Sequence, residues 1–151
     1  MKKLFLALVG TTALLSVAVS ATAAETPFKG TVNAVETSQV VFPIASVTRD
    51  GGGTATQLGK YREHVTIQVN VLTSHGVGAA TFTAANGDTL TATVDGQATP
   101  ASPGVISIVE VYTITGGTGR FAGATGTFTL KNILNQATGV SSGTFSGAID
   151  H

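Results

Sequence analysis

The chain has 151 residues, with eight basic and eight acidic side chains, nineteen glycines and no cysteine. Because cysteine is absent, there is no disulfide framework, and a folded domain of this chain must be stabilised by its core alone. Because basic and acidic side chains are equal in number, the chain lacks the excess of basic residues expected of a protein that binds nucleic acid or an anionic membrane.

The first residues have the pattern of a secretory signal peptide. Two lysines precede an apolar run over residues 4–19, and small side chains follow at residues 21–24. The apolar run is interrupted at residues 10–12 and no basic stop-transfer segment follows it, which argues against a membrane anchor. We therefore predict a signal peptide over residues 1–23 that is cleaved after Ala23 or Ala24, a single domain over residues 24–151, and a secreted or periplasmic protein. Loss of the two lysines leaves six basic against eight acidic side chains.

The rest of the chain has the composition of an all-β protein, because threonine, valine, alanine and glycine dominate and no long segment has helical spacing. About eight runs of alternating apolar and polar residues are expected as strands. They are Phe28–Glu36, Val40–Val47, Tyr61–Val71, Val77–Ala84, Thr89–Thr99, Val105–Thr115, Gly123–Asn132 and Ser142–Ile149.

Glycine and proline mark the connections between these runs. The glycine-rich residues 50–54 are expected as a loop between the second and third strands, and residues 99–104 as a turn. Asn86 and Gly87 stand between two alternating runs, and this dipeptide favours the positive φ angles of a type I′ hairpin turn. We therefore predict a β-hairpin over residues 79–95.

Five glycines lie within eleven residues at 116–126, between a β-branched run and a Thr/Phe/Thr/Leu run. Residues 114–126 read ITGGTGRFAGATG, which resembles the glycine signature of the allene oxide cyclase and dirigent barrels. The resemblance implies a small antiparallel barrel of about eight strands with a central cavity, a trimer in many members, and closest likeness to secreted bacterial members of that superfamily. It implies no functional residue, because the motif residues of the cyclase and dirigent proteins have no matching positions here.

Two carboxylates fall on otherwise apolar faces of the expected strands. Glu63 alternates with Val65 and Ile67, and Glu110 alternates with Ile108 and Tyr112, so both are expected to point inward. A buried carboxylate must be hydrogen-bonded, paired or protonated, because its desolvation costs several kcal/mol.

Each glutamate is therefore either a structural partner of Arg120 or of a tyrosine hydroxyl, or an acid facing a cavity. In the second case Glu63, Glu110 and Tyr112 are the candidate catalytic residues, with Tyr61 near them.

The candidate ligand-binding residues are Tyr61, Phe82, Phe128 and Arg120. Phe82 and Phe128 share the expected interior with small alanines, which leave room in a barrel of eight strands for a filled core or one small ligand. Arg120 lies beside Phe121 in the glycine segment, where its guanidinium either fixes the turn or meets an anionic ligand at a cavity mouth.

Other chemistries lack their motifs. Residues 117–122 match the dinucleotide pattern G-x-G-x-x-A, but a strand rather than a helix follows, so no nucleotide site is expected. Metal sites need three or four convergent ligands, and the only adjacent pair, Glu63 and His64, points to opposite strand faces. We expect no metal, no cofactor, no nucleic acid partner and no membrane anchor.

Three functions remain open. The first is a secreted, non-catalytic barrel that binds a small apolar ligand or serves as a stable exported module. The second is a cyclase or isomerase that uses an interior carboxylate. The third is a homo-oligomeric interaction protein, a trimer by the resemblance. A cavity that exposes both acids favours the enzyme, a wholly apolar cavity favours the binding protein, and a filled core with an apolar outer patch favours the oligomer.

Overall fold

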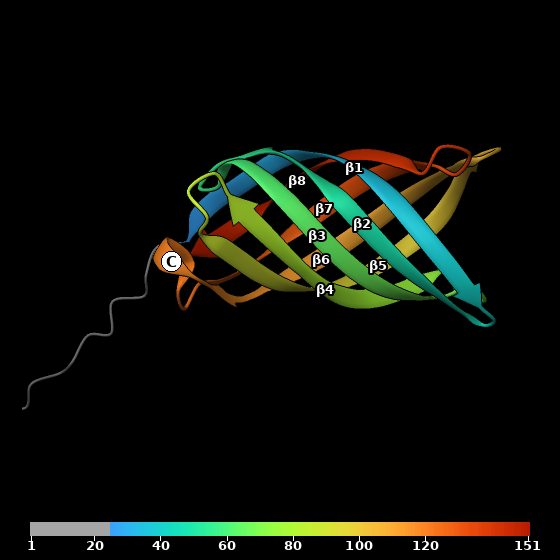
Figure 1. The fold of residues 1–151 in the computed structure, drawn as a ribbon, viewed down its shortest axis with the longest axis horizontal. Helices are drawn as coiled ribbons and strands as arrows, with labels where there is room; N and C mark the ends of the chain where they lie inside the picture. The colour runs from blue at the N-terminus through green and yellow to red at the C-terminus, as the bar shows by residue number, and fades with distance from the viewer. Residues whose placement is uncertain (1–24) are drawn as a thin grey trace, which may run out of the picture.

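The computed structural model describes residues 25–151, which form eight antiparallel strands closed into one barrel (Figure 1). Each strand pairs with the next along the chain, and β8 pairs with β1, so every described strand has two neighbours. This confirms the predicted all-β barrel of eight strands. The strands are β1 (Thr26–Val41), β2 (Ile44–Ala55), β3 (Gly59–Asn70), β4 (His75–Ala84), β5 (Thr89–Ser102), β6 (Val105–Gly117), β7 (Thr125–Asn135) and β8 (Val140–Asp150).

The predicted signal peptide lies outside the described residues. Within residues 25–151 no helix is long and apolar enough to cross a membrane.

The first hairpin differs from the prediction. Strand β1 continues to Val41, and β2 runs through Gly51, Gly52 and Gly53, so the expected loop over residues 50–54 is wrong. A Cβ atom at any of these three glycines would overlap a backbone oxygen of a neighbouring strand. The glycines therefore allow β2 to pack closely between β1 and β3, where we had read them as a flexible connection.

The hairpin predicted over residues 79–95 is confirmed, but its turn is longer than a two-residue type I′ turn. Strand β4 ends at Ala84 and β5 begins at Thr89, and only Gly87 of the central residues has a positive φ, of 90°. The Ala84 N–H donates to the Asp88 carbonyl, which closes a four-residue turn.

The barrel interior divides into two halves with different side chains. In the half nearer the start of β1, aromatic rings fill the lumen, with ring centroids 4.6–6.4 Å apart. In the other half, small residues occupy many inward positions, including Ala45, Gly76, Gly96 and Ala98. Large rings thus close one half, and small side chains leave the other half open. The rings belong to Phe28, Tyr61, Phe82, Tyr112, Phe128 and Phe145.

A short 3-10 helix, η1 (Gly119–Phe121), covers the aromatic end of the barrel, where the chain's C-terminus also lies (Figure 1). Phe121 is fully buried beneath this turn. Gly119 has a φ of 58°, in the left-handed region that favours glycine, whereas Gly117 is outside this region and is restricted by the Thr89 carbonyl oxygen and the Phe121 Cβ. We call this end the closed end.

Candidate functional site

A buried arginine crosses the barrel lumen near its middle. Arg49 on β2 is 1% exposed, and its Nε donates to Glu63 Oε1 on β3 at 2.9 Å. Its Nη1 donates to Glu110 Oε2 on β6 at 2.8 Å, and its Nη2 donates to the Tyr112 hydroxyl. The Tyr112 hydroxyl donates in turn to Glu110 Oε2 at 2.9 Å. Each of the three guanidinium nitrogens therefore donates one hydrogen bond.

Glu36 on β1 is the third carboxylate around this arginine, and it is held less closely. Its Oε1 lies 3.9 Å from Arg49 Nη1, and it accepts a long 3.4 Å hydrogen bond from Asn132 Nδ2 on β7. One guanidinium thus faces three carboxylates, from Glu36, Glu63 and Glu110. We call these four residues, together with Tyr112, the Arg49 cluster.

Burial dominates the ionisation of this cluster. Desolvation raises the pKa of Glu36 and of Glu63 above 4.5, because the attraction of Arg49 does not fully offset it. Desolvation also raises the pKa of Tyr112 well above 10, so its hydroxyl stays protonated and able to donate. Burial alone would lower the pKa of Arg49, but the facing Tyr112 and carboxylates raise it, so the arginine stays charged.

A pocket of about 250 Å³ opens on the other side of the Arg49 cluster from the aromatic rings. Glu36 and Glu110 contribute to its lining, whereas Glu63 does not. The carboxylates therefore form a polar floor beneath walls that are mainly apolar. The larger wall side chains are Val47, Ile67, Val69, Ile106, Ile108 and Leu134.

The pocket opens at the end of the barrel that carries the β1–β2, β3–β4, β5–β6 and β7–β8 turns, on the right in Figure 1. We call this end of the barrel the open end. Two of these turns are joined, because the Val71 N–H donates to the Pro43 carbonyl at 3.0 Å. Together they expose an apolar rim that carries no charged side chain. The rim consists of Val40, Val41, Phe42, Ile44, Val71 and Leu72.

The two predicted acids, Glu63 and Glu110, are buried inside the barrel as expected, with 5% and 2% of the whole residue exposed. The partner expected for them was wrong, because Arg49 rather than Arg120 forms their ion pairs. Tyr112 is also part of this site, where its ring stacks on Phe128 at 4.6 Å.

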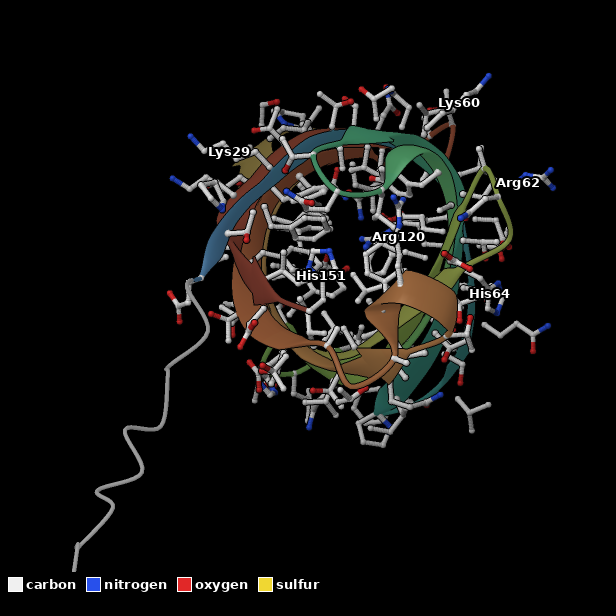
Figure 2. All side chains as sticks on the ribbon, turned by 90° about the vertical axis from the view of Figure 1, so that its left-hand side faces the viewer. Lys29, Lys60, Arg62, His64, Arg120 and His151 are labelled. Carbon is white, nitrogen blue, oxygen red and sulfur yellow. The ribbon has the colours of Figure 1, made fainter. Side chains whose placement is uncertain are left out.

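Arg120 lies at the closed end, away from the pocket. Its Nε is 4.0 Å from Asp88 Oδ2, its guanidinium lies over the Phe121 ring at 4.9 Å, and its side chain is half exposed. Figure 2 views this end and shows Arg120 and His151 within the outline of the ring of strands, with Lys29, Lys60, Arg62 and His64 around the outside. These contacts agree with a role in fixing the turn.

The other three candidate ligand-binding residues pack among the rings of the closed half. Phe82 and Phe128 are each 2% exposed, and the Tyr61 hydroxyl donates to the Thr31 carbonyl at 2.9 Å. Burial raises the pKa of Tyr61, so this donor stays protonated. None of the three lines the open-end pocket.

Two functional residues, Arg49 and Glu36, were missed. The alternation Ala45, Val47, Arg49 places Arg49 inward, but the expected strand ended at Val47 because of the glycines that follow. Glu36 similarly alternates with Ala34 and was taken as a strand end.

Metal binding has no support among residues 25–151, where no three His, Cys, Asp or Glu side chains are placed to hold an ion. Other hollows lie elsewhere on the barrel. One, at the closed end, is lined by Tyr61, Arg62, Ala84 and neighbouring residues, and another, near the open end, is lined by Thr37, Gln39, Ser46 and neighbouring polar residues. The open-end pocket is distinguished by its buried ionisable groups.

Comparison with protein-family models, with curated protein sequences and with solved structures finds no match for this chain in any of the three.

Proposed function

We propose that this chain is an exported, non-catalytic barrel that binds one small, largely apolar molecule through its open end. The observation that supports this most is the division of the lumen, with rings filling one half and a pocket with apolar walls in the other. Burial of apolar ligand surface against such walls contributes roughly 25 cal/mol per Å².

The size of the pocket limits the ligand. Small-molecule sites are typically about 300–1,000 Å³, and barrels of eight strands have room for one small ligand. A volume of about 250 Å³ therefore suits a short aliphatic chain or a single ring system. The uncharged rim supports entry of an apolar molecule at this end.

A cyclase or isomerase is the second candidate, because an acid with a raised pKa lies on the pocket floor. Glu36 lines the pocket, and Tyr112 donates to the neighbouring Glu110. The criterion for the enzyme was exposure of both predicted acids to the cavity, and Glu63 is not in the lining. The criterion for the binding protein, a wholly apolar cavity, is not met in full either, because Glu36 and Glu110 are in the lining, and the preference for binding rests on the mainly apolar walls.

A homo-oligomer of the allene oxide cyclase or dirigent type stays a proposal that is compatible with either function. The outer face carries exposed apolar side chains, among them Val77, Val109, Val111 and Ile133. Light scattering during size-exclusion chromatography distinguishes a trimer from a monomer directly.

Calorimetric titration with octanol tests the binding function. We expect one saturable site per chain in the parent. Ala98→Phe places a ring in the pocket and should weaken octanol binding by about tenfold or more. Ala79→Phe is the matched control, because Ala79 is exposed and lies on the outer face of β4. Equal loss in both variants, or no binding to the parent, would contradict the proposal.

A further inference from the structure

The charges of the Arg49 cluster do not balance within the described residues. Glu63 and Glu110 receive short hydrogen bonds from Arg49, whereas Glu36 is 3.9 Å from the nearest arginine nitrogen. Three buried carboxylates share one cation, so the cluster lacks positive charge at Glu36. A buried carboxylate without a close cation or good donors is costly.

Two buried polar atoms beside Glu36 also lack partners. Asn132 is 1% exposed and Ser141 is fully buried, yet Asn132 Oδ1 and Ser141 Oγ make no hydrogen bond in the described part of the chain. Asn132 donates to Glu36 through its other amide atom, and the Ser141 hydroxyl is close enough to help lower the pKa of Glu36. Unpartnered buried polar atoms are rare and indicate an additional ligand or donor. The Asn132 oxygen can only accept, whereas the Ser141 hydroxyl can accept or donate, so a donor placed here would satisfy the amide oxygen.

Glu36 is also the acid of the cluster that a ligand reaches most easily. Its side chain is 9% exposed and lines the pocket, against 2% for Glu63 and 3% for Glu110. An incoming head group therefore meets Glu36 first, with Glu110 beside it.

On these observations, and resting on the proposed binding function, we propose that the ligand is an aliphatic amine. Its ammonium group binds at Glu36 and Glu110, near Asn132 Oδ1 and Ser141 Oγ, and its chain lies between the apolar walls. An ammonium supplies both the missing cation and three donors.

The same geometry disfavours an acidic ligand. Arg49 already donates to Glu63, Glu110 and Tyr112, so at most one N–H on each Nη is left for a carboxylate or phosphate. A ligand carboxylate would enter next to Glu36 and Glu110, where like charges repel.

At a pH where Glu36 is protonated, amine binding should also release a proton. The groups that face Glu36 are Arg49 on β2, Glu110 on β6, Asn132 on β7 and Ser141 on β8. Burial raises the pKa of Glu36 in the empty pocket, and an ammonium beside it favours the ionised carboxylate. The observed binding enthalpy should therefore depend on the ionisation enthalpy of the buffer.

The test compares octylamine, octanol and octanoate, which share a chain and differ in head group, by calorimetry on the exported protein at neutral pH. We expect octylamine to bind about tenfold more tightly than octanol, and octanoate to bind most weakly. Glu36→Gln should reduce octylamine affinity to that of octanol. Asp95→Asn, which removes an exposed acid on β5, should leave the preference unchanged.

The outcomes separate this inference from the proposed function. Equal affinity for octylamine and octanol, or tightest binding of octanoate, overturns the amine proposal while the apolar binding function stands. Absence of binding by all three overturns both. If Glu36→Gln does not fold, the ligand series and the proton release in the parent protein decide the question.

Discussion

Arg49 and Glu110 meet across the width of the barrel, with Arg49 Nη1 2.8 Å from Glu110 Oε2. Their strands, β2 and β6, are separated by three strands in either direction around the ring. This ion pair therefore joins opposite walls, and it separates the aromatic half of the lumen from the pocket.

Replacement of Arg49 should be strongly destabilising. Arg49→Met leaves three carboxylates without a cation in the barrel interior, and loss of one partner of a buried pair costs about 3–5 kcal/mol. Arg62→Met, an exposed arginine on the adjacent strand, should change stability by less than about 0.5 kcal/mol. Urea denaturation at neutral pH measures both. Equal stability of Arg49→Met and the parent would show that the cluster is not held by this arginine.

Glu110→Gln should cost less, about 1–3 kcal/mol, because Arg49 keeps its bond to Glu63. The cost should nearly disappear when Arg49 is already methionine, since neighbours that share an ion pair are not additive. A double-mutant cycle measures this coupling. An undiminished cost in the Arg49→Met background would show that Glu110 acts independently of Arg49.

The sequence predicts the fold and three of the five residues of this cluster, Glu63, Glu110 and Tyr112. Alternation with isoleucine and tyrosine is enough to turn Glu63 and Glu110 inward, because side-chain direction in a strand has a period of two. Which cation meets them depends on closure of the barrel, which brings β2 opposite β6. That pairing is not local, so Arg120, which is near Glu110 in sequence, was chosen instead of Arg49.

The strand around Arg49 was missed for a similar reason. Three consecutive glycines at 51–53 read as a flexible loop, although their missing Cβ atoms allow close packing of β2 against its neighbours. Arg49 stands just before them and was therefore left outside the expected strand. The pocket could not be predicted either, because the sequence does not show which half of the lumen the rings occupy.

Stability should decrease as pH rises above about 4.5. The pKa of Glu36 and of Glu63 is raised in the folded protein, so the folded state binds more protons than the unfolded state between 4.5 and the raised values. This stabilisation is complete below pH 4.5 and is lost as pH rises through the folded-state pKa. Glu36→Gln should flatten the curve of unfolding free energy between pH 4 and 8, measured by urea titration, while Asp95→Asn keeps the parent slope. If the unfolding free energy of Glu36→Gln depends on pH as steeply as that of the parent protein, the pKa of Glu36 is not raised.

The closed end depends on Gly119. Its φ of 58° and the Asp88 carboxylate that fills the place of a Cβ both disfavour a side chain. Gly119→Ala should therefore cost about 1 kcal/mol or more. Gly59→Asn is the control, because Gly59 has a φ of 65° with open space around it and asparagine tolerates this conformation. Thermal unfolding compares the two, and a similar small effect in both would mean that Asp88 moves freely aside.

The most direct test of the binding site is methyl NMR of carbon-13-labelled isoleucine and leucine during an octanol titration. Ile67, Ile106, Ile108 and Leu134 line the open-end pocket, whereas Leu90 is buried in the core and does not line it. We predict saturable shifts of the four pocket residues with little change at Leu90. Shifts centred on Leu90, or on the exposed rim residue Leu72 alone, would contradict a ligand site in the open half of the barrel.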